Sequence, residues 1–104
     1  MSFAWTLHRF RSGWFSANLP LLVLRLLSRD KMSEWEILAS LHKAFGLSPT
    51  PRELGRLEAS LVRDGYVSLT WERGDKRLEI TSEGVELLQR LESENASVVA
   101  GLGP

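Results

Sequence analysis

Apolar residues recur with the spacing of helices over the first two thirds of the chain. The stretch from Leu19 to Leu27 is apolar on nearly every side, with Arg25 as its only charge. Such a segment is typical of a helix that lies in the middle of a fold and is buried all round. Asn18 can cap this helix, and Pro20 is tolerated in its first turn.

A second helix is predicted from about residue 34 to 45. Ser33 and Glu36 have the spacing of a capping box, in which each side chain binds a free backbone N–H of the first turn. Gly46 is placed to end the helix in the left-handed conformation. The apolar residues that share one face of this helix are Ile37, Leu38, Leu41 and Phe45.

The third helix has the clearest end signals and is predicted over residues 51–64. Thr50 is its cap, Pro51 occupies the first helical position, and Glu53 completes a capping box. Gly65 follows as the residue that ends the helix. The buried stripe of this helix consists of Leu54, Leu57 and Leu61.

After the third helix, the apolar spacing changes to the alternation of β-strands. Strands are predicted over residues 66–72 and 77–81, and Gly74–Asp75 between them is a hairpin-turn signal. The alternating apolar residues are Val67, Leu69 and Trp71 in the first strand and Leu78 and Ile80 in the second.

Both ends of the chain add further segments. Residues 1–18 are rich in aromatic side chains, with a helix expected at about 3–11. A last helix, capped by Thr81 or Ser82, is expected over residues 82–97, before a flexible tail at 98–104. The apolar stripe of the first segment is Phe3, Leu7, Phe10 and Trp14, and that of the last helix is Leu87, Leu88 and Leu91.

The order of these elements indicates the fold class. Three helices followed by a two-stranded hairpin is the pattern of a winged helix-turn-helix domain, which is mainly α with a small β-hairpin (α+β). The short link over residues 46–49 joins the two helices of the helix-turn-helix. We therefore expect residues 19–81 to form the winged domain, with residues 1–18 and 82–97 added at its ends.

Composition narrows the classes of function. The chain has 104 residues, of which 43% are hydrophobic and 25% charged, as in one ordinary globular domain. The absence of cysteine excludes disulfides and thiolate chemistry and fits the reducing cytoplasm. No apolar run reaches the about 20 residues that span a bilayer, so no membrane partner is expected. The formal net charge is zero, so nucleic-acid binding must depend on a local arrangement of basic residues.

One face of the third helix carries such an arrangement. At 100° per residue, Arg52, Arg56 and Arg63 fall within about 40° of one another and opposite the leucine stripe. Ala59 lies among them and Ser60 borders them. A helix of this kind can enter the major groove, where arginine reads guanine edges or grips phosphates. The simpler interpretation is a solvated face that balances the acidic residues Glu53, Glu58 and Asp64.

The hairpin supplies a second group of basic residues. Arg73, Lys76 and Arg77 surround the predicted turn, where they can reach the sugar-phosphate backbone of DNA. Charged residues at hairpin tips also serve solubility alone.

The four tryptophans divide into two pairs. Trp35 and Trp71 are most simply core or core-edge residues. Trp5 and Trp14 precede the predicted winged domain, and with Phe3 and Phe10 they suggest a dimer interface or a pocket for a flat aromatic effector. Packing of this segment on its own domain is the alternative. The stripe Leu87, Leu88 and Leu91 has the same two interpretations, dimer contact or core.

Catalysis finds little support in the sequence. His8 and His42 lie in different elements, and no catalytic triad, phosphate loop or paired-carboxylate arrangement appears. We expect no enzyme activity, no metal site and no cofactor.

Several short pieces of the sequence follow one another in a familiar order. They are Leu21-Leu-Val-Leu-Arg-Leu-Leu27, Met32-Ser-Glu-Trp-Glu-Ile37, Phe45-Gly-Leu-Ser-Pro49, Leu57-Glu58, Leu61, Asp64-Gly-Tyr-Val67 and Leu78-Glu-Ile-Thr-Ser-Glu-Gly84. In this order they resemble the PadR-like winged-helix transcriptional regulators. The chain departs from the family pattern at Ser33-Glu34, where His-Gly is usual, and in its return strand, which lacks aromatic residues.

This resemblance implies a homodimeric repressor that reads a palindromic DNA operator. It implies that helix 51–64 enters the major groove and that hairpin 66–81 is the wing. The first and last helices would then form the dimer, with a small aromatic effector held near Trp5 and Trp14. The alternative is a winged-helix module for protein–protein interaction that does not bind DNA.

Overall fold

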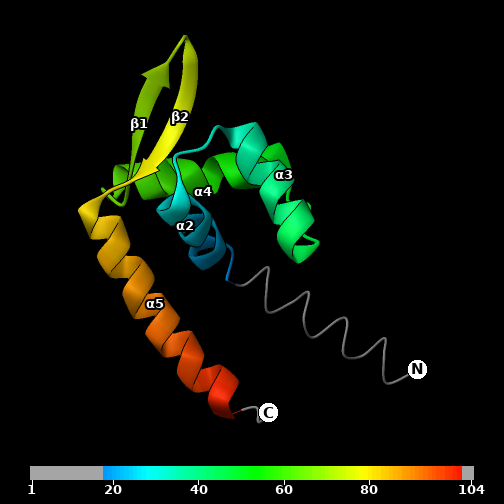
Figure 1. The fold of residues 1–104 in the computed structure, drawn as a ribbon, viewed down its shortest axis with the longest axis vertical. Coiled ribbons are helices and arrows are strands. Elements are labelled where there is room, and N and C mark those ends of the chain that lie inside the picture. Colours follow the sequence, from blue (N-terminus) through cyan, green and yellow to red (C-terminus); the bar gives the residue numbers. More distant parts are fainter. Residues whose placement is uncertain (1–17, 102–104) are drawn as a thin grey trace.

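The computed structural model describes residues 18–101, and its elements follow the expected order (Figure 1). They are α2 (Leu19–Arg29), α3 (Glu34–Phe45), α4 (Pro51–Arg63), β1 (Val67–Glu72), β2 (Asp75–Ile80) and α5 (Ser82–Gly101). The predicted helix at 3–11, with Phe3, Trp5, Phe10 and Trp14, lies outside the described residues. The predicted fold class, helices with a small hairpin, is confirmed.

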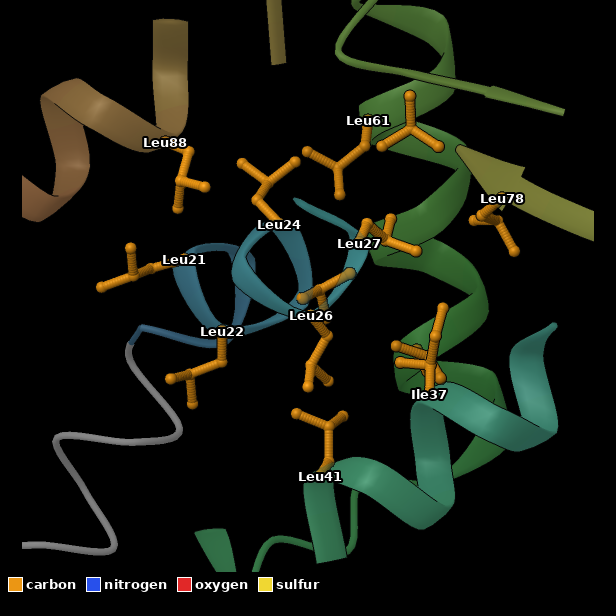
Figure 2. Close-up of a cluster of buried hydrophobic side chains, with 13 residues drawn as sticks. Leu21, Leu22, Leu24, Leu26, Leu27, Ile37, Leu41, Leu61, Leu78 and Leu88 are labelled. Atoms are coloured by element: carbon orange, nitrogen blue, oxygen red, sulfur yellow. The ribbon is translucent and has the colours of Figure 1, made fainter. Parts of the chain in front are cut away.

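Helix α2 is the centre of the core. Six of its eleven residues are buried, and Val23 and Leu24 have no exposed surface. Its leucines point toward the other helices and the hairpin, so that Leu88 of α5, Leu61 of α4 and Ile37 of α3 gather around it (Figure 2). The prediction of a helix buried nearly all round is therefore confirmed.

The helix caps are formed only in part as predicted. Thr50 and Glu53 make the full capping box of α4. The Ser33 hydroxyl accepts a hydrogen bond from the Glu36 N–H, as predicted. The Glu36 carboxylate, however, accepts from the Ser33 hydroxyl and from the Arg77 guanidinium, and not from the Ser33 N–H. The predicted cap by Asn18 is wrong: its side chain makes no capping hydrogen bond, and its backbone is not in the extended conformation that caps adopt.

The hairpin turns one residue earlier than predicted. Glu72 pairs with Asp75, so Arg73 and Gly74 form the two-residue loop and Asp75 already belongs to β2. Both loop residues have positive φ, 52° and 83°. Such a turn matches the twist of the flanking strands, and it holds Arg73 in the left-handed region, where non-glycine residues are uncommon.

A third backbone segment joins the hairpin to the helices. Met32, in the link between α2 and α3, exchanges two hydrogen bonds with Leu78 of β2, at 3.1 and 2.7 Å. This bridge fixes the base of the hairpin against the start of α3.

Helix α5 begins where the hairpin ends. The Thr81 hydroxyl accepts the Gly84 N–H and donates to the Gly65 carbonyl oxygen, so it caps α5 as predicted and ties it to the end of α4. Leu88 is buried against α2, and Leu87 and Leu91 are partly buried there. The helix continues to Gly101, beyond the predicted end at residue 97, and runs away from the hairpin (Figure 1).

The prediction that Trp35 and Trp71 are core or core-edge residues is wrong. Trp35 is 75% exposed because it lies on the side of α3 opposite the buried Ile37. Trp71 is 69% exposed because the hairpin projects beyond the helices (Figure 1). Along β1, burial is complete at Val67, and Leu69 is already 45% exposed.

Candidate nucleic-acid interface

The outer face of α4 presents the three arginines as a group. The helix buries Leu54 and Leu61, and this directs Arg52, Arg56 and Arg63 toward solvent. Within residues 18–101, Arg52 and Arg56 make no ion pair, so their guanidinium groups are available to an external anion. A guanidinium in this state offers its whole donor fork to a phosphate or a base edge.

Arg63 is exposed but has neighbours on its own helix. Its side chain is 74% exposed, and its Nε lies 3.4 Å from the Asp64 carboxylate. Its Nη2 donates to the Ser60 hydroxyl at 3.4 Å. These are weak, solvent-screened contacts that an incoming phosphate can replace.

The two faces of the hairpin separate the basic residues that the sequence grouped together. By register, Lys76 is opposite Trp71 and shares its face with Leu69, whereas Arg77 is opposite Thr70 on the other face. Lys76 and Leu69 line a cleft against α4, so the Lys76 face is the one turned toward the arginines. Arg73 stands at the turn and is exposed.

Arg77 is held inside a network of charges. Its Nη1 donates to Glu36 of α3 at 2.7 Å, its Nε lies 3.4 Å from a Glu72 oxygen, and its side chain is only 26% exposed. Lys31 pairs with the same Glu72. The hydrogen bond between them lowers the pKa of Glu72 and raises the pKa of Lys31. Of the predicted DNA contacts, Arg77 is therefore the least available.

The cleft between α4 and the hairpin contains a buried carboxyl group. Glu58 is 6% exposed, and its Oε1 has no hydrogen-bond partner. Burial raises the pKa of Glu58 to about 7; the negative charge of Glu34 adds to this rise, and Lys76 opposes it. The sequence had grouped Glu58 with the solvated acidic residues, and its burial overturns that interpretation. The cleft is lined by Glu34, Gly55, Glu58, Ala59, Val62, Arg63, Leu69 and Lys76.

Replacing Glu58 by glutamine is expected to remove a pH-dependent loss of stability. Because the folded state raises the pKa of Glu58 above its unfolded value, stability is greatest below about pH 4.5 and falls as pH rises through about 7. At pH 8 the Glu58→Gln protein should be more stable by about 1–2 kcal/mol, less than the full shift implies because Lys76 and solvent screen the charge.

Urea unfolding at pH 4 and pH 8 measures this difference. Glu86→Gln, on the exposed surface of α5, removes the same charge and serves as the control. If the two variants show the same pH profile, the buried carboxyl is not the cause.

No protein-family model and no curated sequence matches the chain. Several solved structures, in contrast, superpose on most of the chain. A transcriptional regulator from Clostridium thermocellum superposes with a TM-score of 0.77 at 16% identity, over 88% of this chain and 96% of that one. A PadR-family transcriptional regulator from Eggerthella lenta superposes with a TM-score of 0.76 at 24% identity, over 96% of this chain and 88% of that one. A winged-helix DNA-binding protein from STIV superposes with a TM-score of 0.71 at 17% identity, over 80% of this chain and 91% of that one.

The chain has the winged-helix fold of the PadR-family regulators. In winged-helix terms, α3 and α4 are the helix-turn-helix, α4 is its second helix, and the β1–β2 hairpin is the wing. The structure brings Arg52, Arg56 and Arg63 together on α4 and sets Lys76 on the wing face turned toward them. Trp71 and Glu58 are the residues of this region that sequence reasoning missed.

Proposed function

We propose that this protein is a non-enzymatic transcription regulator that binds double-stranded DNA. The observation that carries the proposal is the outer face of α4, where Arg52 and Arg56 are exposed and form no ion pair within residues 18–101. The second helix of a helix-turn-helix is the element that enters the major groove. Several proteins of known structure with this fold are transcriptional regulators, and one is a winged-helix DNA-binding protein.

In the proposed complex each basic residue has a role. Arg52, Arg56 and Arg63 face the major groove, with Ser60 at the edge of the contact. Arg73 and Lys76 of the wing reach the sugar-phosphate backbone. Arg77, which belongs to the same predicted set, keeps the wing in place through Glu36 and contacts phosphate only at its exposed edge.

We further propose that the protein works as a cytoplasmic homodimer and acts as a repressor. The supporting feature is α5: among its residues 82–95, whose side chains the structure describes, Leu88 is buried, and Leu87 and Leu91 keep part of their surface. The aromatic residues Phe3, Trp5, Phe10 and Trp14 are the other proposed dimer contacts, and they would also line a site for a small aromatic effector. Sedimentation of the full chain, alone and without residues 1–18, tests the dimer.

The test of DNA binding is a fluorescence-anisotropy titration with a random-sequence duplex at two salt concentrations. Each phosphate contact made by lysine or arginine releases counterions. With about four such contacts, affinity should fall about 100-fold between roughly 50 mM and 200 mM salt. Binding that does not change with salt would contradict the proposal. No binding at the lower salt would favour a protein–protein interaction module instead.

A further inference from the structure

The wing carries an apolar surface that the basic residues alone do not explain. Trp71 is 69% exposed and Leu69 is 45% exposed, although large apolar side chains gain from burial. They are two positions apart on one strand, so they lie on the same face of the hairpin. Together with Lys76, which pairs with Trp71 across the strands, they form what we call the wing contact surface.

We propose that the wing contact surface packs against the deoxyribose and base edges of the DNA minor groove, with the Trp71 indole as its main contact. This inference rests on the proposed function and adds to it a DNA contact that does not depend on charge. Apolar side chains of other DNA-binding proteins enter minor grooves in this way.

The distribution of charge on the hairpin favours a polyanion as the partner. The register places all three hairpin carboxylates, Glu72, Asp75 and Glu79, on the opposite face. The face with Trp71 carries Lys76 and no acid, and Arg73 lies at the adjacent turn. A partner with a negative backbone around an apolar interior matches this pattern, and a minor groove has both.

The wing contact surface is also continuous with the arginine face of α4. Leu69 and Lys76 line the same cleft as Arg63 of α4, and the carboxyl groups of Glu34 and the buried Glu58 line it as well. A duplex that contacts the outer face of α4 therefore extends toward the wing, where the next exposed side chain along β1 is Trp71.

The hairpin is rigid enough to present an indole at a defined place. Met32 bridges β2 by two backbone hydrogen bonds, and Arg77 pairs with Glu36 of α3 behind it. A side chain on a fixed element loses little conformational entropy when it binds, so its apolar contact contributes more to affinity.

A pair of single-tryptophan proteins tests where Trp71 lies in the complex. In one, Trp5, Trp14 and Trp35 are replaced by phenylalanine; in the other, Trp5, Trp14 and Trp71 are replaced by phenylalanine and Trp35 is kept. When the protein is saturated with excess duplex at low salt, acrylamide quenching of Trp71 should fall about twofold or more as the groove covers it. Trp35 has similar exposure on α3 and is the reference. Unchanged quenching of Trp71 in a saturated complex overturns the proposal.

Affinity gives an independent readout that separates this contact from the ionic ones. Trp71→Ala should weaken duplex binding about 5- to 50-fold while the slope of affinity against salt stays the same, since no phosphate contact is lost. Trp35→Ala should leave both unchanged. A reduced slope, or an affinity equal to that of the unaltered protein, contradicts the minor-groove contact. If the unaltered protein binds no duplex, the proposed function fails, and the contact surface fails with it.

Discussion

Replacing Arg56 by glutamate should abolish duplex binding at low salt, with a loss of about 100-fold or more. Arg56 lies in the middle of the exposed arginine group, between Arg52 and Arg63 on the outer face of α4. The substitution removes a bidentate donor and adds a negative charge that faces DNA phosphates at close range. The slope of affinity against salt should also become shallower by about one or two units, because fewer counterions are released.

The matched control is Arg90→Glu. Arg90 is exposed on α5, away from the arginine face, and its replacement changes the net charge by the same amount. The anisotropy titration should give the affinity of the unaltered protein for the control and no saturation for Arg56→Glu. Equal losses in both variants would mean that only net charge matters and that α4 is not the DNA-contacting helix.

Replacing Gly84 by alanine should be among the most damaging single changes in the fold. A Cβ at this position would overlap the Tyr66 carbonyl oxygen and come within 2.7 Å of Ile80 Cγ1. The Tyr66 oxygen cannot retreat easily, because it accepts the Thr81 N–H at 3.0 Å where the hairpin joins α5. We expect a loss of about 3 kcal/mol or more, the upper end for overpacking, because the obstacle is backbone.

Thermal unfolding followed by circular dichroism measures this loss. For a domain of this size, the midpoint should fall by more than about 10 °C. Gly55→Ala is the control, since a Cβ there meets no atom within 4 Å and alanine favours the helix. A Gly84→Ala protein as stable as this control would show that α5 can shift away from the start of β1.

Much of the fold could be predicted because its signals are local. The cap, proline and glutamate that start α4 all lie within the four residues from Thr50 to Glu53. The glycines that follow α3 and α4, Gly46 and Gly65, have the positive φ that ends a helix. The arginine face of α4 was predictable for the same reason, since a helical period and one apolar stripe determine which side is exposed.

The errors concern features that depend on contacts between distant segments. Alternation along β1 identifies which side chains share a face, but it cannot show that the hairpin projects beyond the core and leaves Trp71 exposed. Glu58 is buried because the hairpin packs across its side of α4. The turn at Arg73–Gly74 was displaced by one residue, because the register depends on the pairing of both strands.

The backbone bridge between Met32 and Leu78 attaches the wing to the helical part of the fold. Because it ties the hairpin to the start of α3, the distance from the wing to α4 is set by the fold. In the proposed complex, the affinity for a DNA sequence should therefore depend on the width of its minor groove. Minor grooves are narrow over A-tracts and wider elsewhere. Because α4 and the wing would contact DNA at a fixed separation, some sequences are favoured even at base pairs that no side chain touches. Operator preference would then depend on the stiffness of the wing as well as on the arginines.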